Sequence, residues 1–332
     1  MRRNRWVAVG IIALVALLCL GIWTRYQTHD SARGEDVLFG GSDASGNPLS
    51  DTWAWNGDTW KQLSPVTSPP AREYASAVYD PATKNVVLFG GANVNGETRL
   101  GDTWVWNGIN WNQLSPTTSP PARSGASMTY DSATGNVLLF GGFGNGTVFN
   151  DTWAWNGINW SLLSPPLSPP PRKGAAMAYD PISKAVVLFG GNDLRGSFYG
   201  DTWTWDGTTW TKVPASTSPL PRDGASMVFD EHSRKLVLFG GEDGVSLNDT
   251  WTWDRNTWSQ SPVPTSPPAR YNAAVAGDMA HDDVVMFGGF SSGGTTYGDT
   301  WTWNGDTWSQ RNLISSPPMR AGASLVFVPA TN

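Results

Sequence analysis

Arginine and aspartate recur at a fixed spacing along this chain, and their pairing is the first chemistry that the sequence offers. Each of six repeated units has one arginine at a fixed position, and each has one aspartate that opens an Asp-Thr-Trp triplet. The arginines are Arg72, Arg123, Arg172, Arg222, Arg270 and Arg320, and the aspartates are Asp51, Asp102, Asp151, Asp201, Asp249 and Asp299. A guanidinium group can form two parallel hydrogen bonds with a carboxylate. The recurrence therefore predicts six structural ion pairs. The alternative is a ring of arginines at a tunnel mouth that binds an anionic ligand. Strict repetition favours the structural role, because an asymmetric ligand seldom needs six identical contacts.

The units that carry these residues repeat with a period of about 50 residues. A Gly-Gly pair ends an apolar run at residues 40–41, 90–91, 141–142, 190–191, 240–241 and 288–289. Such a period indicates one structural unit copied around or along an axis. Three tryptophans recur in every unit, as Trp53, Trp55 and Trp60 do in the first. Perfect recurrence favours packing between units over the alternative, which is exposed tryptophan that stacks on sugars.

Within one unit, residues 72–114 predict four short strands. Residues 75–79 are mostly small, 86–89 are apolar throughout, 102–106 alternate with period two, and 111–114 follow an Asn-Gly turn. We label these strands A to D. A four-stranded meander that is apolar on both faces needs a neighbour on each side, which radial stacking provides.

The two ends of the repeat array complement each other. The first unit lacks strand A and starts with residues 36–39, whereas the last segment, residues 320–328, reads as a strand A with nothing after it. Pairing the two would complete a sixth sheet and remove both free edges. The sequence therefore predicts an all-β, six-bladed propeller closed by its C-terminal strand.

The order of features in each unit resembles the kelch repeat. Pro-x-Arg, a small-residue strand, an apolar strand, Gly-Gly, a variable loop, an aromatic strand and a tryptophan follow one another over residues 36–328. One departure is that Trp55 and Trp106 stand where kelch strands usually carry tyrosine. The resemblance implies a six-bladed propeller that usually serves as a binding scaffold and sometimes as an enzyme, and fold does not fix function.

An uncharged run of 17 residues, Val7 to Trp23, precedes the repeats. Arg2, Arg3 and Arg5 lie before it, which predicts a membrane anchor with its N-terminus inside. The expected organisation is a cytoplasmic tail (1–6), a transmembrane signal anchor (7–23), a linker (24–35) and the propeller (36–332). A cleaved signal peptide and lipidation at Cys19 are alternatives that also place the repeats outside the cytoplasm; a buried globular helix is disfavoured.

Charge and cysteine content exclude some functions. Five of the 22 basic residues and one of the 28 acidic residues lie in 1–33, which leaves 17 basic and 27 acidic residues in 34–332. No basic stripe survives, so a nucleic-acid partner is not expected. The one cysteine of the chain, Cys19, lies in the apolar segment, so no disulfide is expected in the repeats.

Recognition is expected where the repeats differ. The loops between strands B and C vary in sequence, and so do the residues next to each arginine in the connection from D to A; both emerge on one face. The ligand-binding candidates are Arg99, Arg195, Phe198, Tyr199, Tyr297, Glu73, Tyr74 and Tyr271. Lys173, Asp223 and Asn272 also break the repeat beside the arginines and are expected at the tunnel entrance. The alternative is simple drift in exposed turns.

Catalytic signatures are sparse. His29, His232 and His281 form no cluster with metal-ligand spacing, and no Ser/His/Asp set is evident, so neither a metal nor a cofactor is expected. The leading hypothesis is a membrane-tethered, extracytoplasmic scaffold that binds a protein or glycan through the face of the B–C and D–A loops. Alternatives are a sugar-modifying enzyme of the epimerase or lyase type at the tunnel mouth, and a purely structural role.

Overall fold

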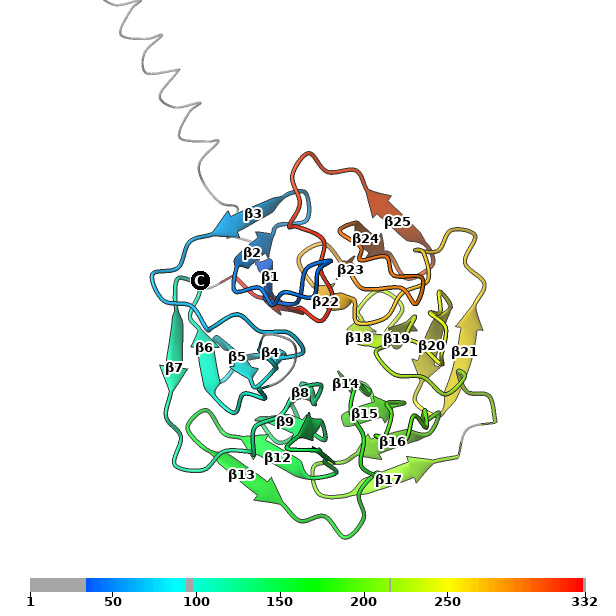
Figure 1. The fold of residues 1–332 in the computed structure, drawn as a ribbon. Coiled ribbons are helices and arrows are strands. Elements are labelled where there is room, and N and C mark those ends of the chain that lie inside the picture. The colour runs from blue at the N-terminus through cyan, green and yellow to red at the C-terminus, as the bar shows by residue number, and fades with distance from the viewer. Residues whose placement is uncertain (1–33, 94–97, 215, 331–332) are drawn as a thin grey trace, which may run out of the picture.

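Six four-stranded antiparallel sheets stand around a central axis (Figure 1). The structure, a computed structural model, describes residues 34–93, 98–214 and 216–330. Each sheet is one blade, and in five of the six blades the strands follow the chain from the axis outward. The predicted all-β, six-bladed propeller is therefore confirmed.

The strands occupy the same four positions in every blade. Strand A, nearest the axis, is β26 (Ser324–Val328), β4 (Ser76–Asp80), β8 (Ser127–Asp131), β14 (Ala176–Asp180), β18 (Ser226–Asp230) and β22 (Ala274–Asp278) in blades 1 to 6. Strand B is β1 (Glu35–Phe39), β5 (Asn85–Phe89), β9 (Asn136–Phe140), β15 (Ala185–Phe189), β19 (Lys235–Phe239) and β23 (Asp283–Phe287). Strand C is β2 (Thr52–Trp55), β6 (Thr103–Trp106), β12 (Thr152–Trp155), β16 (Thr202–Trp205), β20 (Thr250–Asp254) and β24 (Thr300–Trp303). Strand D is β3 (Trp60–Leu63), β7 (Trp111–Leu114), β13 (Trp160–Leu163), β17 (Trp210–Val213), β21 (Thr257–Ser261) and β25 (Trp308–Arg311). A short hairpin, β10 (Phe143–Gly144) and β11 (Thr147–Val148), lies in the B–C loop of blade 3.

The ring closes through its two ends. The C-terminal strand β26 pairs antiparallel with β1, in a register that runs from Glu35 opposite Val328 to Phe39 opposite Ser324. Blade 1 thus takes strand A from the end of the chain and strands B to D from its beginning. This is the closure that the sequence predicts, and it leaves β1 paired on both sides, with β26 and β2.

The apolar strands B supply core to both neighbouring blades. In β5, Val86 and Leu88 pack with Val37 of blade 1, whereas Val87 and Phe89 pack with Val137 of blade 3. The period of two along a strand sends alternate side chains to opposite faces. A strand with an inter-blade core on each side must therefore be apolar on both faces, as residues 86–89 of β5 are.

The third tryptophan of each unit joins its blade to the preceding one. Its indole N–H donates a hydrogen bond to the threonine that opens strand C there, as Trp111 does to Thr52 at 3.1 Å. Its ring also meets the phenylalanine at the end of the preceding strand B, with 5.0 Å between the centroids of Trp111 and Phe39. The other five pairs with threonine are Trp60–Thr300, Trp160–Thr103, Trp210–Thr152, Trp258–Thr202 and Trp308–Thr250. These contacts give the tryptophans the inter-blade packing expected from their recurrence.

The Gly-Gly pairs serve both backbone geometry and close packing. Gly90 and Gly91 have φ angles of 69° and 102°, in the region that residues with a Cβ rarely occupy. The N–H of Gly91 donates to the carbonyl of Arg123 in the next blade at 2.9 Å. A Cβ on Gly90 would lie 2.5 Å from that same carbonyl oxygen. The glycines therefore allow the B–C loop of one blade to contact the next.

The predicted membrane anchor, at residues 7–23, lies outside the described residues, as do the N-terminal tail and most of the linker. Within the described ranges, no helix has the length and apolar character needed to cross a membrane. Strand β1 begins at Glu35, one residue before the predicted start of the propeller.

Candidate functional site

Each of the six repeated arginines is clamped inside its own blade. In blade 2, Arg72 Nη1 and Nη2 lie 2.7 and 2.9 Å from the two carboxylate oxygens of Asp102. Its Nε donates to the carbonyl of Pro70 and its Nη1 to that of Gly90, both at 3.0 Å. The same bidentate pair forms in the other blades, as Arg123–Asp151, Arg172–Asp201, Arg222–Asp249, Arg270–Asp299 and Arg320–Asp51. The clamp ties the D–A connection to the start of strand C.

The arginines of the clamps are sealed from solvent. All six arginine side chains have 0% exposure. Asp102 also accepts the indole N–H of Trp104 at 2.7 Å. Burial alone would raise the pKa of Asp102, but the hydrogen bonds and charge of Arg72 outweigh it and hold that pKa below its usual value. The arginines have no exposed surface with which to bind an anion.

Two of the predicted ligand-binding residues cover these clamps. The guanidinium of Arg172 lies 4.2 Å from the ring centroid of Tyr199, and that of Arg270 lies 3.9 Å from Tyr297. Aromatic faces attract such cations. Arg195 lies at the exposed tip of its B–C loop, and Phe198 is half-buried in a bridge with Asn192. The structure does not bring these four candidates into one site.

The other four candidates line a cavity on the axis. Every blade has an antiparallel bridge between the residue after its arginine and the residue after its Gly-Gly. We call these the mouth pairs, and in blades 1 to 6 they are Ala321–Ser42, Glu73–Ala92, Ser124–Phe143, Lys173–Asn192, Asp223–Glu242 and Tyr271–Phe290. The backbone geometry is the same in all six, whereas the side chains differ in each. An invariant frame therefore presents twelve variable side chains around the axis.

Below the mouth pairs, the backbone forms a closed ring of hydrogen bonds. The N–H of Tyr74 donates to the carbonyl of Gly322, and Gly125, Gly174, Gly224, Asn272 and Gly322 each donate in turn to the preceding member, at distances of 2.8–3.0 Å. All six residues have φ between 53° and 65°. Four are glycine, as this conformation favours, but Tyr74 and Asn272 adopt it with a side chain. Non-glycine residues in this region store strain and cluster at functional sites.

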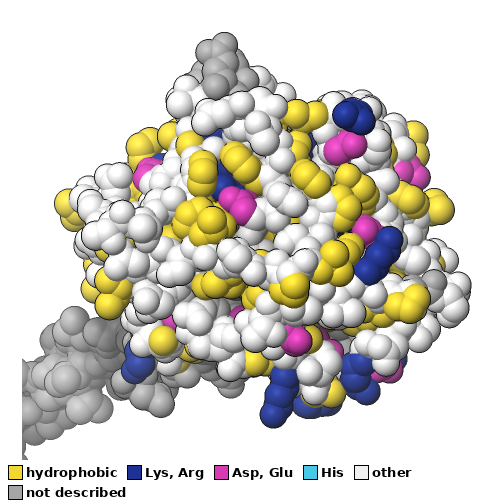
Figure 2. Space-filling view, turned by 90° about the horizontal axis from the view of Figure 1, so that it is seen from below, with side chains coloured by type: hydrophobic (Ala, Val, Ile, Leu, Met, Phe, Trp, Pro, Cys, Tyr) yellow, Lys and Arg dark blue, Asp and Glu magenta, His cyan; other side chains and the backbone are white. Residues whose placement is uncertain are grey.

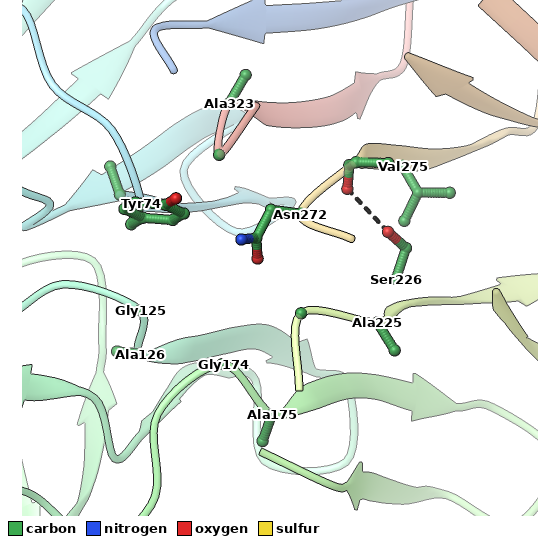
Figure 3. A pocket seen from close by; sticks show the side chains of 14 residues that line it. Tyr74, Gly125, Ala126, Gly174, Ala175, Ala225, Ser226, Asn272, Val275 and Ala323 are labelled. Carbon is green, nitrogen blue, oxygen red and sulfur yellow. Dashed lines mark hydrogen bonds between the residues drawn. The ribbon is translucent and has the colours of Figure 1, made fainter. Parts of the chain in front are cut away.

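The side chains of Tyr74 and Asn272 project over the axis, opposite Gly125 and Gly174 (Figure 3). A Cβ on Gly322 would lie 2.8 Å from the ring of Tyr74, and one on Gly224 would lie 2.7 Å from the amide oxygen of Asn272. The adjacent glycines therefore make room for these two side chains. Tyr74 and Asn272 form part of the floor of a cavity of about 330 Å³. We call it the axial cavity.

The walls of the axial cavity bring together charged and aromatic groups from five blades. Blade 2 contributes Glu73, Tyr74 and Arg99; the remaining polar or aromatic lining comes from Ser124, Phe143, Lys173, Asn192, Asp223, Glu242, Tyr271 and Asn272. The guanidinium of Arg99 lies 5.0 Å from the ring centroid of Phe143. The side chains that line the cavity therefore differ from blade to blade, whereas the backbone that supports them repeats six times.

Electrostatics single out the carboxyl pair of blade 5. Burial, and then the charge of Glu242, raise the pKa of Asp223 to about 7, while Lys173 acts in the opposite direction. Burial also raises the pKa of Glu242. The pKa of Tyr271 rises to about 12 through burial and the charges of Glu242 and Asp223. Asp223 therefore changes its protonation state near neutral pH.

Sequence reasoning missed Glu242 and Asn192, because each was read as the first residue of a variable loop. The signal was present: each directly follows a Gly-Gly pair, and that position bridges to the residue after the arginine. Asp193 holds its own loop by accepting the backbone N–H groups of Arg195 and Ser197. In the described part of the chain, no group of three or more His, Cys, Asp or Glu side chains is arranged to hold a metal ion.

Comparison with known proteins places the chain in a family. The model of the KLHDC2/KLHL20/DRC7 kelch-repeats domain matches residues 28–218 and 205–331. An F-box/kelch-repeat protein of Arabidopsis thaliana is 36% identical over 125 residues, a stretch that covers 33% of this chain and 26% of that protein. The chain belongs to the kelch-repeat β-propeller family. Kelch propellers in general act as protein-binding scaffolds.

Proposed function

We propose that this chain is a binding scaffold that recognises a protein through the face formed by its B–C and D–A loops. The observation that carries the proposal is the set of mouth pairs, in which a repeated backbone presents different side chains in each blade. Variable side chains on a rigid frame are typical of recognition surfaces. Elsewhere, Figure 2 shows apolar, basic and acidic side chains interspersed over the side of the propeller that it views.

The proposed scaffold is membrane-tethered and extracytoplasmic. This part of the proposal rests on the apolar run Val7 to Trp23 and on the arginines that precede it. A glycan is the alternative ligand on the same face. Proteolysis of intact and permeabilised cells would test the location: an extracytoplasmic propeller is digested in intact cells, whereas a cytoplasmic one is protected until permeabilisation.

The binding face is tested by capturing partners with the full chain in detergent micelles. Arg195→Ala combined with Glu73→Ala alters two blades of the loop face, and Glu231→Ala combined with Asp306→Asn alters exposed residues of the A–B and C–D turns on the opposite face. We expect a specific partner to be lost with the first variant and retained with the second. Loss with the second variant alone would place binding on the opposite face and refute the proposal.

A sugar-modifying enzyme is the second candidate function, and one observation favours it. Asp223, with a pKa of about 7 in the axial cavity, has the protonation behaviour that general acid–base catalysis requires. The repeated arginines do not add to this candidate, because their side chains are sealed in the clamps. Incubation with sialic acids and uronic acids, followed by NMR detection of epimerisation or elimination, separates the two. Turnover that Asp223→Asn abolishes would establish the enzyme.

A further inference from the structure

We propose that the axial cavity is a binding site for one basic side chain of the partner protein. Asp223, Glu242 and Asn192 hold the ammonium or guanidinium group of that side chain. This inference rests on the proposed function, because the basic side chain belongs to the partner on the loop face. It assigns a ligand chemistry to the cavity, and its test uses small probes that do not depend on knowing the partner.

The first observation is the mouth pair of blade 5. Asp223 and Glu242 face each other directly across an antiparallel bridge, with both backbone hydrogen bonds formed at 3.0 and 2.9 Å. Like charges directly opposite on neighbouring strands destabilise a sheet. No other mouth pair among the described residues places two carboxylates opposite each other. A cation between the two groups would convert this repulsion into attraction.

The second observation is that the cavity wall contains buried acceptors with no donor. Asp223 Oδ1 and Asn192 Oδ1, from neighbouring blades, are buried and have no hydrogen-bond partner within the described residues. Buried polar atoms are almost always paired, so two such oxygens in one cavity require a source of N–H or O–H groups. An ordered water could donate to them but would not offset the carboxylate charges. An ammonium has three donors and a guanidinium has five, and both supply the positive charge.

The third observation is the balance of charge around the pair. Lys173 faces it from blade 4, and its charge lowers the pKa of both Asp223 and Glu242; Asp243 acts in the opposite direction on Glu242. Glu73 and Arg99 lie in the blade 2 wall. Burial raises the pKa of Tyr74, and so do the charges of Glu73, Asp223 and Glu242. The carboxylates therefore determine the sign of the field at the cavity floor, which favours a cation.

Size and lining point to a single side chain. At about 330 Å³ the cavity lies at the lower end of the range for small-ligand sites, which suits one long side chain rather than a folded element. Tyr74 and Tyr271 add aromatic surface from blades 2 and 6, and aromatic faces attract ammonium and guanidinium groups. The cavity therefore offers carboxylates to the charged end of a lysine or arginine side chain and tyrosine rings to its aliphatic stem.

Calorimetric titration of the full chain in detergent micelles tests the inference. The probes are Nα-acetyl-lysine methylamide, Nα-acetyl-arginine methylamide and the neutral Nα-acetyl-norleucine methylamide, with free putrescine as a fourth arm. We expect a capped basic residue to bind and the norleucine probe not to bind. Because a carboxyl group with a pKa of about 7 is mostly protonated at pH 6 and mostly ionised at pH 8, the affinity should rise by up to about tenfold between these values.

Charge variants give the sign of the interaction. Asp223→Asn and Glu242→Gln should each weaken binding of the basic probe by at least about tenfold, the effect expected when one member of a buried charge pair is lost. Lys173→Met should tighten binding, because it removes the cation whose charge acts on Asp223 and Glu242. Asp306→Asn, which makes the same charge change on the opposite face, should leave binding unchanged. Melting curves of each variant confirm that it is folded.

Several outcomes would overturn the inference. Binding of the norleucine probe as tight as that of the lysine probe would make the cavity an apolar site. Weaker binding with Lys173→Met would mean that the cavity selects an anion, and tighter binding of putrescine than of either capped residue would indicate a free polyamine. A partner protein whose binding responds to Arg195→Ala but not to Asp223→Asn would leave the proposed function standing and remove this inference. Binding of the basic probe, with no protein partner found, would leave the cation site standing and remove the proposed function.

Discussion

Trp60 and Thr300 are 240 residues apart in the chain, and the indole N–H of the first donates to the hydroxyl of the second at 2.9 Å. The same bond joins every other pair of neighbouring blades, so the seam where the ring closes is bonded like the five continuous ones. The ring of Trp60 also lies 5.3 Å from that of Phe287 in blade 6. Closure therefore depends on side chains between blades as well as on the pairing of β26 with β1.

Thr300→Val should weaken this seam. The substitution keeps the shape of the side chain but leaves the buried N–H of Trp60 without its acceptor, which costs about 1–3 kcal/mol. Thr211→Val, on the exposed strand β17, is the matched control and should change stability by less than about 0.5 kcal/mol. Denaturant unfolding of both variants measures the difference. Equal midpoints would show that the hydrogen bond contributes nothing to closure.

Arg72→Met should be among the most damaging single substitutions. It keeps most of the side-chain volume but leaves the carboxylate of Asp102 without its bidentate partner and removes the donors to Pro70 and Gly90. Loss of one member of a buried ion pair costs about 3–5 kcal/mol. Lys212→Met removes an exposed pair whose Nζ–Oδ2 distance to Asp201 is 3.9 Å, and should cost less than about 1 kcal/mol. The free energies of unfolding of the two variants are compared at pH 7. Similar losses of stability would contradict the stabilising role of the clamp.

Asp36→Val should stabilise the propeller. Asp36 is fully buried opposite Trp55, at the register position where blade 2 has Val86 opposite Trp106. Neither of its carboxylate oxygens has a hydrogen-bond partner within the described residues, and burial, together with the charges of Asp278 and Glu35, raises its pKa. Restoring an apolar side chain should add about 2–4 kcal/mol at pH 7. Val86→Asp, the reverse change in blade 2, should destabilise; a stable Val86→Asp variant would refute this account.

Asp223→Asn should make stability less dependent on pH. The folded pKa of Asp223, about 7, lies above its usual value near 4, so the folded protein holds a proton that the unfolded chain releases between these values. Wild-type stability should therefore fall as the pH rises from 4 to 7 and level off above 7. The variant should be more stable by about 1–3 kcal/mol at pH 8 and nearly equal at pH 4. With Asp306→Asn as the control, a difference that is constant across pH would count against the raised pKa.

Much of the fold was predictable because the frame is repeated. The period of the Gly-Gly pairs gives six blades, and the unmatched strands at residues 36–39 and 320–328 imply closure. The pairing of each arginine with an aspartate was one of two readings of their recurrence. The choice between them needed the burial of the guanidinium groups, which depends on how the D–A and B–C loops pack in three dimensions.

The site was less accessible to sequence reasoning, because its members are single residues in loops of changing length. Glu73, Tyr74, Arg99 and Tyr271 line the axial cavity, whereas Tyr199 and Tyr297 cover buried arginines. Both groups break the repeat, so variation alone could not separate them. The bridge that brings Glu242 opposite Asp223 spans two loops, and only the backbone geometry shows it.

The ring of backbone hydrogen bonds beneath the mouth pairs has a consequence for how new specificities could arise. Its donors and acceptors are all main-chain atoms, so its bonds do not depend on the identity of the twelve side chains above it. Two positions in each blade can therefore be exchanged without breaking this ring. A library randomised at the mouth pairs, and at no other position, would explore many ligand chemistries on one unchanged scaffold.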